Sequence, residues 1–98
     1  MRITWRSDKQ RRNIGKHGLD LSLAARVFAE PLAQTIWDRF VDGWQRWCRF
    51  GGVTMGGRFK IAVVVHTYPD LGDDIWVQVI GLREATAHAR RQQDISNF

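Results

Sequence analysis

The run Ile61-Ala62-Val63-Val64-Val65, followed by His66, is the most apolar stretch of the chain and decides the fold. Five consecutive apolar residues, most of them β-branched, are typical of a strand that is covered on both faces. We therefore place this strand at the centre of a sheet. The segment 75–82, which follows a loop containing Pro69 and Gly72, is predicted to be its neighbour.

Two more strands precede the central one in the sequence. Residues 35–40 and 44–50 have the β-branched and aromatic composition of strands, and the short turn 41–43, Val-Asp-Gly, predicts that they form a hairpin. The pair Gly56-Gly57 marks the next turn. The sequence thus predicts a meander of four antiparallel strands.

A short β-prone segment, Ile3-Thr4-Trp5, opens the chain and a basic helix is predicted to follow it. Ser7 and Gln10 have the spacing of a capping box, so this helix is expected to run from about Asp8 to His17. Gly18 would end it in the left-handed conformation that glycine adopts without strain.

A second helix is indicated by apolar residues at helical spacing, with Asp20 as its cap and Pro31 as its stop. Its apolar positions are Leu21, Ala24, Ala25 and Phe28. A last helix is expected to begin near Arg83 and run to about Gln93. The predicted fold class is α+β, a single domain over residues 1–98: a short strand and two helices, then a four-stranded antiparallel sheet and a C-terminal helix.

Positive charge is concentrated in the first helix. The chain carries a net charge of +5, and residues 1–17 alone hold six basic side chains against Asp8. Such a patch attracts polyanions, so nucleic acid is the leading expected partner and an acidic protein segment the second. A solvated helix face is the plain alternative.

Cys48 is the single cysteine, which rules out an intramolecular disulfide and a cysteine-rich zinc site. No apolar run approaches the roughly 18 residues of a membrane span, and the N-terminus lacks the apolar stretch of a signal peptide. We expect a cytoplasmic protein with no membrane partner.

Several short motifs occur in order along the chain. Asn13, Lys16, His17 and Gly18 form N-x-x-K-H-G before the second helix, which ends in Val-Phe. Further along come Arg46 and Gly51 as R-x-x-x-x-G, the apolar strand 63–67, and residues 82–86, Leu-Arg-Glu-Ala-Thr, close to A-R-x-A-T. In this order and separation, they make the chain resemble the BrnT toxin family.

The resemblance implies a RelE-like fold and ribonuclease activity. It also implies inhibition by a BrnA-type ribbon-helix-helix antitoxin, with operator DNA contacted only through the toxin–antitoxin complex. The chain departs from the family pattern at Gln78, where an arginine is usual, and at Leu82, where alanine is usual. A catalytically impaired binding module that acts with its antitoxin in operon repression is therefore the alternative to an active toxin.

RNA cleavage without a metal requires a base, an acid and cations that hold the phosphorane charge. The expected catalytic residues are His17, Arg46, His66, Arg83 and Thr86, and the expected RNA-binding residues are Lys9, Arg12, Lys16 and Arg58. We expect no cofactor and no metal, because the three histidines show no paired ligand spacing. The hypothesis is a metal-independent endoribonuclease that inhibits translation and growth.

Each site residue also has a structural interpretation. For His17 the structural alternative is a cap of its helix, although a helix C-terminus favours the protonated imidazole; for His66 it is a buried histidine satisfied by backbone. Arg46 shares a strand face with Cys48, and a structural carboxylate would serve it as well as a phosphate. Arg58 fits a solvated turn.

Five tryptophans are many for 98 residues. Trp44 and Trp47 lie on opposite faces of their strand by parity, so at least one of them is expected to point away from the core. Such rings can stack on unpaired bases, but strand tryptophans more often fill a core or a partner interface. We expect part of this excess apolar surface to be where the antitoxin docks.

Overall fold

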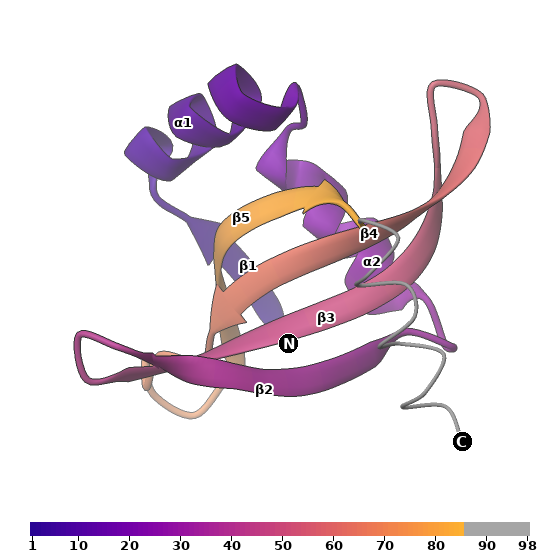
Figure 1. Ribbon diagram of the computed structural model, residues 1–98. Helices are drawn as coiled ribbons and strands as arrows, with labels where there is room; N and C mark the ends of the chain where they lie inside the picture. Colours follow the sequence, from indigo (N-terminus) through magenta and orange to yellow (C-terminus); the bar gives the residue numbers. More distant parts are fainter. Residues whose placement is uncertain (86–98) are drawn as a thin grey trace.

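The apolar run 61–65 lies in the central strand of a five-stranded sheet, in a computed structural model that describes residues 1–85 (Figure 1). The elements, in chain order, are β1 (Arg2–Trp5), α1 (Ser7–His17), the 3₁₀ turn η1 (Leu21–Leu23), α2 (Ala24–Ala29), β2 (Gln34–Val41), β3 (Trp44–Met55), β4 (Arg58–Thr67) and β5 (Trp76–Glu84). The α+β class is confirmed.

The sheet has the strand order β1-β5-β4-β3-β2. The central position of β4 and its pairing with β5 are confirmed, as is the hairpin of β2 and β3. The prediction of four antiparallel strands is wrong in one respect, because β1 pairs with β5 in parallel and makes the sheet mixed. Ile3 lies opposite Val77 and Trp5 opposite Val79, so β1 adds its own alternating apolar side chains to the core.

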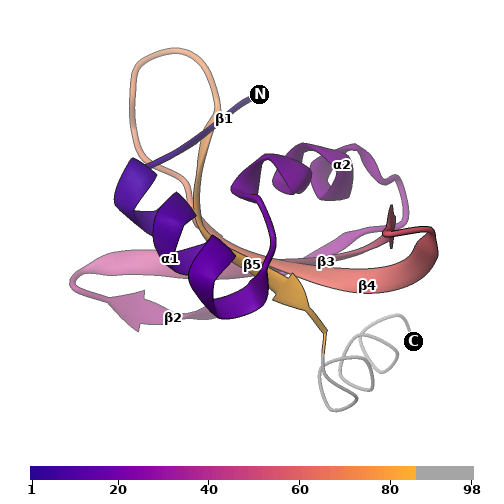
Figure 2. The ribbon, with the colours of Figure 1, turned by 90° about the horizontal axis from the view of Figure 1, so that it is seen from above.

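The turn η1 and α2 cover one face of the sheet, which we call the helix face, whereas α1 lies at the β5 edge (Figure 2). The main core lies between this face and η1 and α2, and consists of Leu21, Ala24, Val27, Val53, Ala62, Val64, Val77, Val79 and Leu82. The opposite side, which we call the second face, carries a smaller cluster of Phe50, Val63 and Ala85. The alternation of side chains along each strand separates the two sets.

The predicted second helix is a 3₁₀ turn followed by one short α-helix. Asp20 caps it as expected, accepting a hydrogen bond from the Ser22 N–H at 2.9 Å. Within residues 1–85, no helix is long and apolar enough to cross a membrane.

The start of α1 differs from the predicted capping box. Arg6 is the N-cap and its side chain makes no capping hydrogen bond. The Gln10 side chain is occupied elsewhere: it donates to the Asp20 carboxylate at 2.7 Å and accepts from the Leu21 N–H at 2.8 Å. Gly18 ends the helix as predicted, with φ +69° and its N–H on the Ile14 carbonyl.

The predicted start of a last helix near Arg83 is wrong, because Arg83 and Glu84 belong to β5. They lie opposite Val63 and Ala62, and the Ala85 N–H still bonds to the Ile61 carbonyl at 2.8 Å. The strand β4 is long enough to offer backbone hydrogen-bond partners as far as Ala85, so the pairing of β5 with β4 continues to that residue. The rest of that predicted helix, Thr86 included, lies outside the described residues.

Candidate functional site

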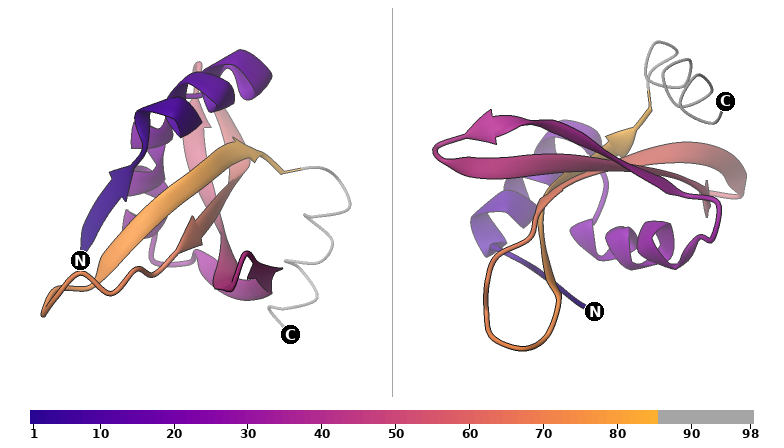
Figure 3. Two further views of the ribbon diagram at one scale, coloured as in Figure 1. Left: turned by 90° about the vertical axis from the view of Figure 1, so that its left-hand side faces the viewer. Right: turned by 90° about the horizontal axis from the view of Figure 1, so that it is seen from below.

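Asn13 attaches α1 to the edge of the sheet. The strand β1 pairs only with the first residues of β5, and beyond them α1 lies beside β5 in place of a strand (Figure 3). The Asn13 amide accepts from the Leu82 N–H and donates to the Leu82 carbonyl, both at 2.9 Å, and it also donates to the Leu19 carbonyl at 2.8 Å. One buried side chain thus replaces a strand partner and fixes α1 against β5.

A pocket of about 330 Å³ lies at the C-terminal end of α1, and we call it the His17 pocket. Its lining residues are His17, Leu19, Met55, Lys60, Arg83 and Glu84. It therefore brings together two of the predicted catalytic residues, His17 from the helix end and Arg83 from β5. Because both are held on regular elements, their separation is set by the fold rather than by a loop.

The imidazole of His17 is tuned toward its neutral form. Partial burial and the nearby charges of Lys16 and Arg83 lower the pKa of His17 below its ordinary value of 6.5. These effects oppose the preference of a helix C-terminus for the protonated ring. A neutral imidazole at neutral pH is the form that accepts a proton.

Lys60 and Glu84 complete the pocket and were missed by sequence reasoning. Their side chains form an exposed ion pair, with 3.3 Å between Lys60 Nζ and Glu84 Oε2. Glu84 was assigned to a helix in the sequence, so its place opposite Ala62 could not be foreseen. Among residues 1–85, no group of three or more His, Cys, Asp or Glu side chains is placed to hold a metal ion.

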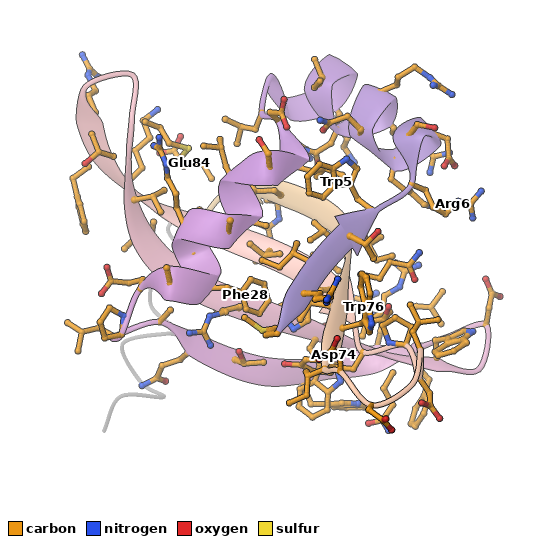
Figure 4. The ribbon with its side chains drawn as sticks, turned by 180° about the vertical axis from the view of Figure 1, so that it is seen from behind. Trp5, Arg6, Phe28, Asp74, Trp76 and Glu84 are labelled. Carbon is orange, nitrogen blue, oxygen red and sulfur yellow. The ribbon has the colours of Figure 1, made fainter. Side chains whose placement is uncertain are left out.

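A second pocket, of about 250 Å³, lies at the other end of α1, and we call it the Trp44 pocket. It is lined by Arg6, Lys9, Val41, Asp42, Trp44, Arg46, Thr67, Gln78 and Ile80. In Figure 4, Arg6 of this pocket and Glu84 of the His17 pocket lie on opposite sides of the molecule. The structure thus groups Arg46 with Lys9 and separates both from His17 and Arg83.

The remaining predicted RNA contacts lie outside the two pockets. Arg12 and Lys16 are exposed and follow Lys9 at positions i+3 and i+7, so these three cations share one flank of α1. Arg58 is exposed at the start of β4, beside the Gly56-Gly57 turn.

His66 lines neither pocket and is completely buried on the helix face. Its ring packs edge-on against Phe28 and Tyr68, with centroids 4.9 and 5.0 Å away, and Phe28 lies between α2 and the sheet (Figure 4). Its Nδ1 lies 3.2 Å from the Val64 carbonyl, which is the backbone partner that the structural interpretation expected. Burial lowers the pKa of His66 to about 4.

A sequence profile described as a ribonuclease toxin, BrnT, of type II toxin–antitoxin systems matches residues 5–88. The chain belongs to the BrnT family. The match spans both pockets and the whole sheet apart from the first residues of β1. A search of curated proteins gave no match.

BrnT membership gives the N-x-x-K-H-G motif a structural explanation. Asn13 anchors α1 to β5, Gly18 ends the helix, and His17 is thereby presented at the pocket. Gly51 of the R-x-x-x-x-G motif lies beneath α2, where an added Cβ would lie 3.0 Å from the Ala33 Cβ and 3.1 Å from a Val27 methyl. The motif residues thus serve the fold as well as the site.

Proposed function

We propose that this BrnT-family protein is a metal-independent endoribonuclease, and that the His17 pocket is where it cleaves RNA. The observation that carries the proposal is the meeting of His17, with its lowered pKa, and the Arg83 guanidinium in one pocket beside Lys60 and Glu84. A base, an acid and a cation that holds the phosphorane charge are what RNA cleavage without a metal needs.

The chemistry assigned to the pocket is an in-line transfer within the RNA. Neutral His17 takes the proton of a 2′-hydroxyl, and the freed oxygen attacks the adjacent phosphorus. Arg83 holds the charge that develops on the phosphorane oxygens, because its planar fork pairs with two of them at once. The bond from phosphorus to the 5′-oxygen breaks, and Lys60 gives that oxygen a proton. The products are a 2′,3′-cyclic phosphate and a 5′-hydroxyl.

The test is cleavage of a defined RNA by the purified chain in excess chelator, with the product ends determined. We expect cyclic or 3′-phosphate ends, and a large loss of activity in His17→Ala and in Arg83→Ala. Arg26→Ala is the matched control, because it removes an exposed arginine of α2 that lines neither pocket. Undiminished cleavage by both pocket variants would overturn this site.

We also propose that the fold is RelE-like, that the protein works in the cytoplasm, and that a BrnA-type antitoxin neutralises it there. The order strand, two helices, four-stranded antiparallel meander supports the fold assignment. Trp37 and Phe40 support a docking surface on β2, since the rings pack together at 5.8 Å while 46% and 63% of their surface is exposed. Operator DNA would be contacted through the antitoxin.

The alternative, an impaired binding module that acts with its antitoxin in operon repression, has one observation in its favour. Gln78 is uncharged and lies in the Trp44 pocket beside Arg46, where the family pattern has a cation. Growth arrest on expression separates the two functions, because an impaired module would bind antitoxin without arresting growth.

A further inference from the structure

The position of Trp44 is fixed by the turn before it. Asp42 and Gly43 form a two-residue hairpin turn with φ of +51° and +80°, the two left-handed residues that a type I′ turn requires. Trp44 is the first residue of β3 after this turn, is 55% exposed and belongs to neither core cluster. The hairpin turn therefore places an exposed indole in the lining of the Trp44 pocket.

Cations line the same pocket as this ring. Lys9 comes from α1 and Arg46 from β3, both half-buried, and within residues 1–85 neither forms an ion pair. Arg6 also lines the pocket but is paired with Asp8 at 3.1 Å. Asp42 alone is acidic among the described lining residues, so positive charge dominates the pocket.

We propose, on the basis of the proposed ribonuclease function, that the Trp44 pocket binds one nucleotide of single-stranded RNA. The base stacks on Trp44, and Lys9 and Arg46 hold the adjoining phosphate. An exposed aromatic ring next to unpaired cations is the combination by which proteins bind single strands, since every base has a face that stacks. Gln78 and Thr67 line the same pocket and supply hydrogen-bonding groups for the nucleotide edge.

The flank of α1 connects this subsite to the His17 pocket. Arg12 and Lys16 continue the row of cations from Lys9 along the helix, which at eleven residues is about 16 Å long. A strand bound along this flank would enter both pockets. The Trp44 pocket is therefore a positioning subsite, at a distance from the bond that is cut.

The decisive experiment measures binding, not cleavage. A fluorescently labelled 2′-O-methyl RNA hexamer, which lacks the attacking hydroxyl, is titrated with the full chain and followed by anisotropy. One base at a time is then replaced by an abasic site. We expect one position at which base removal raises Kd by roughly fivefold or more, the range of stacking on one aromatic ring.

The same loss is expected when Trp44→Ala binds the intact hexamer, with no further loss on the abasic one. Trp44→Phe should keep most of the affinity, and Phe59→Ala, which removes another exposed aromatic ring outside both pockets, should leave Kd unchanged. Independent, additive losses, an unchanged Kd in Trp44→Ala, or no binding of the hexamer would overturn the subsite.

The outcomes for the two proposals remain separate. A chain that shows the Trp44 dependence but cleaves no RNA would overturn the ribonuclease proposal and leave the subsite. Cleavage that depends on His17 and Arg83, with no Trp44 dependence in binding, would overturn the subsite alone.

Discussion

Two histidines were predicted from the sequence to be catalytic, and they lie in opposite surroundings: His66 is buried and His17 is exposed. His66 is sealed into the helix face beneath Phe28, held neutral by burial, and has no described partner for its Nε2. His17 is exposed at the end of α1, in a pocket with Arg83. The difference teaches that His66 belongs to the packing of the helix face, whereas His17 lies in a pocket where it can meet a substrate.

Among the substitutions that test this comparison, Arg83→Ala should have the largest effect. Removing the cation that holds the phosphorane charge should lower kcat by roughly 10²–10³-fold. The thermal midpoint should change little, because within residues 1–85 Arg83 forms no ion pair. Steady-state cleavage and thermal unfolding of the same preparation check both halves. A variant that loses activity only in proportion to lost folded protein would assign Arg83 to stability.

On the helix face, His66 should make stability depend on pH. Its pKa is about 4 in the folded state and 6.5 ordinarily, so between these values the unfolded chain binds a proton that the folded chain refuses. The free energy of unfolding should be highest above pH 6.5 and should fall by about 3 kcal/mol as the pH drops toward 4. Denaturant unfolding measures it.

The control for this prediction uses the other histidine. His66→Gln should flatten the stability change between pH 6.5 and 4, whereas His17→Gln should leave it in place. If the two variants gave the same profile, the contrast between a buried and an exposed histidine would be lost.

Asn13→Ala tests the junction between the two regions. It leaves the buried Leu82 N–H and carbonyl without their partner, which should lower the free energy of unfolding by about 2 kcal/mol. Arg12→Ala, one residue away and exposed, should change it by only a few tenths of that amount. Equal stabilities of the two variants, in urea unfolding, would remove the anchoring role of Asn13.

Gln78→Arg should produce the smallest effect. A cation added to the Trp44 pocket should strengthen binding of the 2′-O-methyl hexamer modestly and steepen the dependence of log K on log salt by about 0.7, the contribution of one more phosphate contact. Titrations at several salt concentrations give the slope. An unchanged slope would mean that no phosphate lies within reach of position 78.

Sequence reasoning predicted the elements better than their neighbours. Apolar periodicity placed β4 at the centre, and Gly18 ended α1 where it was expected. The pairing of β1 with β5 is a contact between the two ends of the described chain, and nothing local in Ile3-Thr4-Trp5 signals it. The capping box failed because Gln10 had a tertiary partner in Asp20 that no local pattern reveals.

Three of the predicted catalytic residues are divided between two pockets for the same reason: tertiary contacts, which no local pattern reveals, decide which side chains meet. His17 and Arg83 were both selected by type and motif, and their meeting depends on Asn13 holding α1 against β5. Arg46 lies on β3 but lines the Trp44 pocket. The register of β3, β4 and β5 decides which side chains of these strands are its neighbours. Residue type identifies chemistry, whereas strand register decides which groups share a pocket.

The most direct test of the central claim, that the His17 pocket cleaves RNA with a neutral imidazole as base, is the pH profile of kcat/KM in chelator. Protonated His17 cannot accept a proton, so the rate should fall as the pH drops through its pKa, with a midpoint below 6.5. His17→Ala should lose this limb together with most of the activity. A midpoint well above 6.5, or a profile that His17→Ala leaves unchanged, would contradict the assignment.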